Sequence, residues 1–122
     1  MSTLEVSNLN DGTTTVATTF VTNGSAKVWV NFTGSGTVAI DDSLNTSSIT
    51  DNSTGRYEAN PTNNFANANY CITHDGLLNG GNGWFMSYHD KTSANVELLY
   101  ISTLGAYADC ADASVLYFGE LA

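Results

Sequence analysis

The sequence is poor in positive charge. Lys27, Arg56 and Lys91 are its only cationic side chains, against twelve carboxylates, and the formal net charge is −9. Binding to DNA or RNA depends on Lys and Arg side chains that neutralise phosphates, so this composition argues against a nucleic-acid partner. The same argument excludes the surface of an anionic membrane. We therefore expect neither nucleic acid nor membrane among the partners of the chain.

Long apolar runs, a signal sequence and a cysteine framework are also missing. The longest apolar runs, at 28–30 and 98–101, are far shorter than the roughly 20 residues that span a bilayer. The first residues have neither a basic n-region nor an apolar h-region, so we expect no signal peptide. Cys71 and Cys110 lie in no CxxC pair and at no zinc-ligand spacing from a histidine. The favoured interpretation is two half-buried thiols, and a Cys71–Cys110 bridge is the alternative.

Catalytic motifs are absent as well. The sequence has no G-x-S-x-G and no Ser-x-x-Lys, and the GGNG at 80–83 is not followed by the Lys-Ser/Thr of a phosphate-binding loop. The carboxylate pairs Asp41–Asp42 and Asp109/Asp112 lie in loop-like sequence and are interpreted as solvated turns rather than the facing acids of a glycosidase. We therefore predict that the chain is not an enzyme and has no cofactor.

Two His-Asp pairs, His74–Asp75 and His89–Asp90, each end a predicted strand. If the two strand ends met, their imidazoles and carboxylates would suit a divalent metal or acid–base chemistry. Asp at the start of a turn and His at a half-exposed strand end is the favoured alternative. His74 and His89 are therefore weak candidates, and we predict no metal site.

What the sequence does have is strand periodicity. In AKVWVNF at 26–32, Val28, Val30 and Phe32 alternate with polar or bulky residues, TGSG follows as a turn, and TVAI at 37–40 returns. NDG at 10–12 leads into TTTVATTFVT, which we also predict to be a strand. Further strands are predicted in NANYCITH, WFMSYH, VELLYIST and SVLYFGEL, with a helical turn conceivable only near 105–113. The pattern predicts an all-β chain, a single antiparallel β-sandwich or small barrel of eight or nine strands.

The division of the chain follows from the same pattern. Residues 1–25 are poorer in aromatic residues, and we predict that they form N-terminal strands or an arm, with attachment as a candidate role. Residues 26–122 are predicted to form the β-sandwich domain, with variable loops in the C-terminal half.

A resemblance to a known family covers about residues 26–73. AKVWVNF, TGSGTVAI, DSLNTSSITDNSTGRY and the ANANY at 66–70 resemble a domain common in tailed-bacteriophage and prophage virion proteins, mostly tail-fibre-like and appendage proteins. Two departures stand out: Asp41 replaces the basic residue that follows the family's "VAI", and Pro61 interrupts the alternation of the next strand. The resemblance implies a structural protein of the virion, located in the virion, and a homotrimer. Because the phrase occurs in several kinds of virion protein, capsid decoration stays an alternative to a tail fibre, and a free carbohydrate-binding module is a third.

Aromatic side chains beside loops are the candidate ligand contacts. Trp84 follows the glycine-rich loop at 75–83, Tyr88 lies four residues on, and Tyr107 lies in the 104–113 connection. Flat rings at a loop rim suit stacking on sugar faces, so a host-surface glycan is the candidate ligand. The alternative is that Trp84, Met86 and Tyr88 form one inward face and fill the core. Apolar residues on both faces of VELLYIST also predict burial against another subunit of the oligomer.

Overall fold

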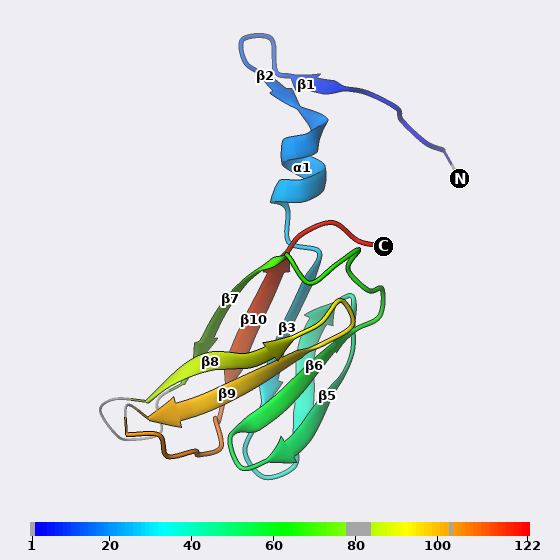
Figure 1. Cartoon of the computed structure of the whole chain (residues 1–122). Coiled ribbons are helices and arrows are strands. Elements are labelled where there is room, and N and C mark those ends of the chain that lie inside the picture. The colour runs from blue at the N-terminus through cyan, green and yellow to red at the C-terminus, as the bar shows by residue number, and fades with distance from the viewer. Residues whose placement is uncertain (1, 78–83, 103) are drawn as a thin grey trace.

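The computed structural model describes residues 2–77, 84–102 and 104–122. Two four-stranded antiparallel sheets lie face to face, with strand orders β4-β3-β10-β7 and β5-β6-β9-β8 (Figure 1). The eight strands are Val28–Thr33 (β3), Ala39–Leu44 (β4), Thr46–Ser53 (β5), Arg56–Pro61 (β6), Cys71–Gly76 (β7), Trp84–Lys91 (β8), Val96–Ser102 (β9) and Ala113–Phe118 (β10). The all-β prediction is confirmed as a sandwich, because neither sheet closes into a barrel.

The β3–β4 hairpin forms where the alternation of AKVWVNF predicts it. Along β3, Val28, Val30 and Phe32 are buried while the residues between them are partly exposed. β4 begins two residues later than predicted, and a register shift between Asn31 and Phe32 adjusts its pairing with β3. A bulge of this kind bends a strand and increases its twist.

The stretch rich in Ser, Thr and Asn after β4 is an edge strand rather than a loop. β5 covers Thr46–Ser53 and pairs only with β6. Ile49 is its one large apolar residue, and it packs against the core. An edge strand has one covered face and an open side, so polar side chains cost little there and discourage pairing with other chains. β6 ends at Pro61, where the missing N–H interrupts no further ladder.

The core lies between the two sheets and contains four buried tyrosines. β3 pairs with β10, opposing Val30 to Val115, and β6 pairs with β9, opposing Tyr57 to Leu98. These pairings join strands far apart in the sequence. The buried residues are Val28, Val30, Phe32, Tyr57, Ala59, Phe65, Tyr70, Met86, Val96, Leu98, Tyr100, Cys110, Ala113, Val115 and Tyr117.

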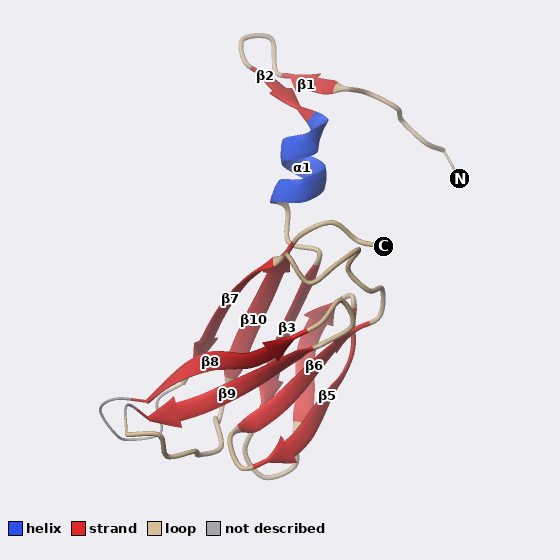
Figure 2. Cartoon of the chain, in the orientation of Figure 1, coloured by secondary structure: helices blue, strands red, loops and turns tan. Residues whose placement is uncertain are grey.

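The N-terminal segment lies outside the sandwich. A two-stranded hairpin of β1 (Asn8–Asn10) and β2 (Thr15–Ala17) leads directly into α1 (Thr18–Gly24), and the chain enters β3 four residues later. In Figure 1 this segment extends from one end of the sandwich, next to the C-terminus. Figure 2 shows α1 as the helix of the described chain. We call residues 2–25 the arm.

The predicted strand at 13–22 is therefore wrong beyond Ala17. β-branched residues such as Thr and Val favour a strand, but a strand needs a partner for its backbone groups. The ladder ends at the pair Asn8–Ala17, and the N–H of Thr18 then donates to the carbonyl of Ser7 at 2.9 Å. With no partner strand beyond that point, a helix supplies the backbone hydrogen bonds from within the segment. No helix forms at 105–113 among the described residues.

Candidate functional site

The three candidate aromatic residues lie on different faces of the β5-β6-β9-β8 sheet. Trp84 and Met86 lie on the face of β8 that turns toward the other sheet: Met86 is buried, and the Trp84 ring stacks on Tyr100 with centroids 5.6 Å apart. Tyr88 shares this face by alternation, but β8 is an edge strand, so the ring is 48% exposed. Met86 is thus part of the core, Trp84 is partly buried and packs against the core, and Tyr88 stays accessible.

Tyr107 lies on the outer face of the same sheet. It forms an antiparallel bridge with Ile101 of β9, and Ile101 pairs on its other side with Phe85 of β8. Paired residues on neighbouring strands present their side chains on the same face. Phe85, Ile101 and Tyr107 therefore form one row across the outer surface, here called the outer row. Phe85 is 46% exposed and Tyr107 44% exposed.

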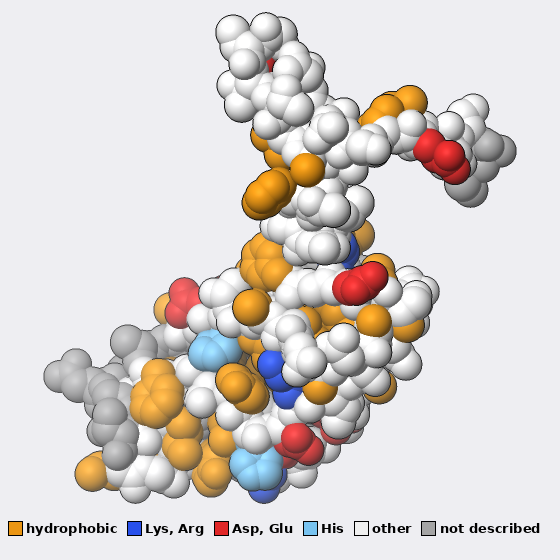
Figure 3. Space-filling model, turned by 45° about the horizontal axis from the view of Figure 1, so that its top comes forward, with side chains coloured by type: hydrophobic (Ala, Val, Ile, Leu, Met, Phe, Trp, Pro, Cys, Tyr) orange, Lys and Arg blue, Asp and Glu red, His pale blue; other side chains and the backbone are white. Residues whose placement is uncertain are grey.

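Phe85 was not among the residues singled out from the sequence. The signal that identifies it is alternation, because an inward Trp84 and Met86 place Phe85 outward. Adjacent strands lie about 4.8 Å apart, so the two rings of the outer row are separated by roughly 10 Å with Ile101 between them. Figure 3 shows apolar side chains gathered beside the grey residues at this end of the molecule. Most of the loop at 75–83 lies outside the described residues.

A tight turn fixes the position of Tyr107. The Ser102 hydroxyl accepts the N–H of Leu104 at 3.3 Å and that of Ala106 at 3.1 Å. The N–H of Ser102 donates to the carbonyl of Ala106 at 2.9 Å, and Gly105 adopts φ 81°. Only glycine adopts this conformation without strain. The turn thus returns the chain alongside β9 and presents the Tyr107 ring on the outer face.

Asp109, two residues after Tyr107, connects this part of the chain to the turn between β5 and β6. Its carboxylate accepts the N–H of Gly55 at 2.9 Å and lies 3.4 Å from the Tyr57 hydroxyl. Asp109 is therefore a structural acceptor, not a freely solvated turn residue as predicted. Asp41 accepts the Thr33 hydroxyl at 3.1 Å, Asp42 accepts the backbone N–H of Ser43 at 2.8 Å, and Asp112 accepts the Asn31 amide at 2.6 Å.

An ionic network lies farther along the outer face of the sheet. Glu97 accepts two hydrogen bonds from the Arg56 guanidinium, at 2.7 and 3.1 Å, through one carboxylate oxygen. Its other oxygen lies 3.0 Å from Nδ1 of His89. His89 is thus engaged by a carboxylate of its own sheet, whereas His74 lies on β7 in the opposite sheet, paired with Val115. Within the described residues, no group of three or more His, Cys, Asp or Glu side chains is placed to hold a metal ion.

A second apolar surface lies on the outer face of the β4-β3-β10-β7 sheet. Leu44, Trp29 and Leu116 form a cross-strand row there, and Leu44 is 49% exposed. A shallow depression of about 410 Å³ lies beside the row, between β3 and β10, with Asn31 and Ser114 at its polar end. Trp29 was not among the candidate site residues predicted from the sequence, although its alternation with the buried valines of β3 places it outward.

Both cysteines are free thiols: Cys71 is exposed and Cys110 is buried. The alternative of a Cys71–Cys110 bridge is therefore wrong.

Among the described residues, no helix combines the length and apolar character that a membrane crossing requires. Comparison with protein-family models, curated proteins and solved structures finds no match for this chain.

Proposed function

We propose that the chain is a structural component of a tailed-phage virion, most simply a tail-fibre-like appendage protein that assembles as a homotrimer. The resemblance of residues 26–73 to virion proteins supports the class of protein. The observation that carries the proposal is the two-ended form of the molecule: the arm leaves one end of the sandwich, and the outer row and the 104–108 turn lie toward the other (Figure 1). An appendage needs one end for attachment and another for contact with its target.

The outer row is the surface that we assign to host recognition, with a surface glycan as the ligand. Two half-exposed rings flanking an aliphatic residue offer a flat, apolar platform of the kind that stacks on the faces of sugars. With a net charge of −9, the protein repels anionic polymers, so the glycan it takes is neutral. Trp84 supports this surface from below by stacking on Tyr100.

Locating the protein on intact particles tests the virion assignment. Gold-labelled antibody against this chain, viewed on purified particles by electron microscopy, is expected to mark the tail or its appendages. Label distributed over the shell would overturn the appendage assignment in favour of capsid decoration. Protein that never co-purifies with particles would overturn the virion assignment and leave a free carbohydrate-binding module.

Glycan binding is tested separately with the double variant Phe85→Ala/Tyr107→Ala. Both side chains are half exposed and outside the core, so the variant is expected to fold and assemble but to lose binding to host cells and to a neutral-glycan array by at least tenfold. Tyr88→Ala is the matched control, because that ring is equally exposed but lies on the other face of the sheet. Loss of binding in Tyr88→Ala with retention in the double variant would move the site to the β8 edge.

A further inference from the structure

The arm is well organised by its own hydrogen bonds. The Asp11 carboxylate accepts the N–H groups of Thr13 at 2.9 Å and Thr14 at 2.7 Å, closing the β1–β2 turn. Hydrogen bonds from the backbone of Thr14 and then of Thr13 lower the pKa of Asp11 to about 2. The Thr18 hydroxyl donates to the carbonyls of Val6 at 3.0 Å and Ser7 at 3.1 Å, which joins the start of α1 to the chain just before β1.

The same arm has no core. None of residues 2–25 is buried, and α1 contributes no buried side chain. A helix of seven residues lies well below the roughly 12–15 residues at which isolated helices become even marginally stable, and an isolated two-stranded hairpin is marginal too. The N-cap of α1, Ala17, makes no side-chain capping hydrogen bond, and the helix has no acidic residue in its first turn and no basic residue in its last. The arm is therefore ordered by hydrogen bonds but buries no side chain, and we expect contact with another surface to stabilise it.

Exposed apolar side chains are concentrated on the arm. Half of the twelve large hydrophobic residues that the described chain exposes lie there, although the arm is only about a fifth of the sequence. They are Leu4, Val6, Leu9, Val16, Phe20 and Val21. Scattered exposed apolar residues are normal, but such a concentration on one small element marks an interaction surface.

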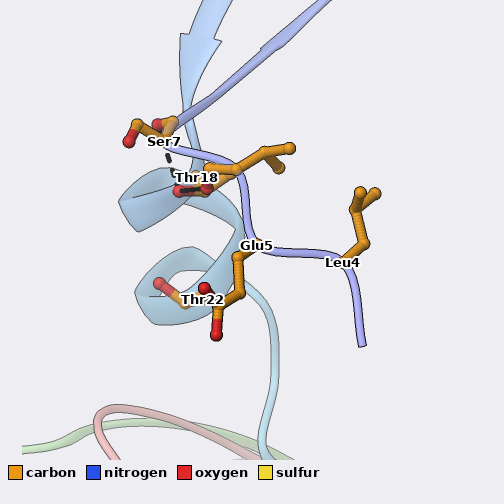
Figure 4. Close-up of a pocket in the computed structure, with 6 residues that line it drawn as sticks. Leu4, Glu5, Ser7, Thr18 and Thr22 are labelled. Atoms are coloured by element: carbon orange, nitrogen blue, oxygen red, sulfur yellow. Dashed lines mark hydrogen bonds between the residues drawn. The ribbon is translucent and has the colours of Figure 1, made fainter. Parts of the chain in front are cut away.

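The arm carries both a hollow and a projecting ring. Leu9 and Val16, a cross-strand pair of the hairpin, line a concavity of about 390 Å³ together with Val21 of α1. A second concavity, of about 590 Å³, lies between α1 and the N-terminal chain. In Figure 4 Glu5 and Thr22 approach each other across it, while Leu4 projects away from the helix. Phe20 lines neither hollow and is 73% exposed. The arm thus offers an apolar knob and an apolar recess on different faces.

We propose that the arm is an assembly interface for other copies of this chain, with Phe20 of one copy seated in the Leu9–Val16–Val21 hollow of the next. The knob and the recess are both apolar, the recess of about 390 Å³ has room for a phenyl ring, and both belong to the same segment. The distribution of charge along the chain also favours contact through the arms. The arm contains two of the twelve carboxylates, while residues 26–122 contain ten with only three cationic side chains. Copies that meet through their arms therefore avoid the repulsion that would oppose contact between sandwiches.

This inference deepens the homo-oligomer of the proposed function and is independent of where the protein lies on a particle. It also moves the expected contact between subunits from β9 to the arm. The two-sided apolar pattern of β9 suggested burial against another subunit, but β9 is a central strand, and Leu99 on its outer face is already 92% covered within the chain. Half of the large apolar side chains that stay exposed belong to the arm, which is a much smaller part of the chain.

Mass measurement in solution on the full chain tests the interface. Native mass spectrometry and sedimentation are expected to give a multiple of the 12.9 kDa chain mass. Phe20→Ser and Val21→Ser should each shift the population toward monomer, raising the dissociation constant at least tenfold. Phe85→Ser is the matched control, since it removes a half-exposed ring from the sandwich and should leave the oligomer intact.

The outcomes separate cleanly because neither arm substitution touches the core, so thermal unfolding of the sandwich should be the same in all variants. A wild-type chain that is monomeric up to high micromolar concentration would overturn the proposal. So would an oligomer that survives both arm substitutions, or one that dissociates on Phe85→Ser instead. None of these results would decide the particle-labelling experiment, so failure of this inference is distinguishable from failure of the virion assignment.

Discussion

The hydroxyl of Tyr57 accepts the backbone N–H of Cys110 at 3.0 Å, which joins the two sheets across the sandwich. Tyr57 belongs to β6 of one sheet, whereas Cys110 precedes β10 of the other. The same hydroxyl donates to the carbonyl of Gly34, just after β3, at 2.8 Å. Gly34 in turn donates its N–H to the carbonyl of Cys110 at 2.9 Å. One buried phenol thus fixes the end of the sandwich that positions the 104–108 turn.

Tyr57→Phe is expected to lower the free energy of unfolding by about 1–3 kcal/mol, because it leaves the Cys110 N–H and the Gly34 carbonyl without their buried partner. Tyr117→Phe is the matched control. The Tyr117 hydroxyl is equally buried but has no hydrogen-bond partner among the described residues, so its removal should be neutral or stabilising. Urea unfolding of both variants measures the difference. Equal losses would show that the Tyr57 hydrogen bonds contribute nothing specific.

Gly55→Ala is expected to be much more damaging than Gly36→Ala. Both glycines have positive φ, 65° and 71°, so each substitution carries a backbone strain of about 1 kcal/mol. A Cβ on Gly55 would also lie 2.5 Å from the carbonyl oxygen of Ala108, while one on Gly36 meets open space. The clash adds about 1–3 kcal/mol to the loss of unfolding free energy at Gly55. A difference below experimental error would contradict the close approach of the two turns.

Stability is expected to fall at alkaline pH. Burial raises the pKa of Tyr57 to about 12, and burial likewise raises the pKa values of Tyr70 and Tyr117 above their ordinary range. A pKa that is higher in the folded than in the unfolded state means that folding favours the neutral phenol. The stability that the neutral phenol contributes is therefore complete below about pH 10, the pKa of tyrosine in the unfolded chain. For Tyr57 the contribution is lost between about pH 10 and 12. Tyrosinate absorbance should show a delayed group of tyrosines that ionise together with unfolding; ordinary titration in a folded protein would contradict the burial.

Only one thiol should react with an alkylating reagent in the folded protein. Cys71 is exposed, whereas Cys110 is buried, its thiol donates to the carbonyl of Asp112 at 2.9 Å, and burial raises its pKa. The thiolate is the reactive form, so both factors protect Cys110. Mass spectrometry should find one label on the native protein, two after unfolding, and none on native Cys71→Ser. Two rapid labels would show that this end of the sandwich opens readily.

The sequence by itself determined the strand content, much of the core and the electrostatic character of the protein. Period-two alternation identified the inward residues of β3, namely Val28, Val30 and Phe32, because local alternation follows directly from strand geometry. The net charge of −9 and the small number of cations likewise needed no structure, since they are properties of composition.

The tertiary structure decided which surfaces are available. Alternation within β8 says that Trp84 and Phe85 face opposite ways, but only the pairing of Met86 with Tyr100 shows which of them faces out. Tyr107 joins Phe85 through a bridge to Ile101 that links the 104–108 turn to β9. The helix in the arm escaped detection because its Thr and Val residues favour strands, and only the absence of a partner strand beyond Ala17 turned the chain into a helix. Local patterns report what one strand prefers, whereas exposure and partnership depend on contacts between residues distant in the sequence, and those form only when the chain folds.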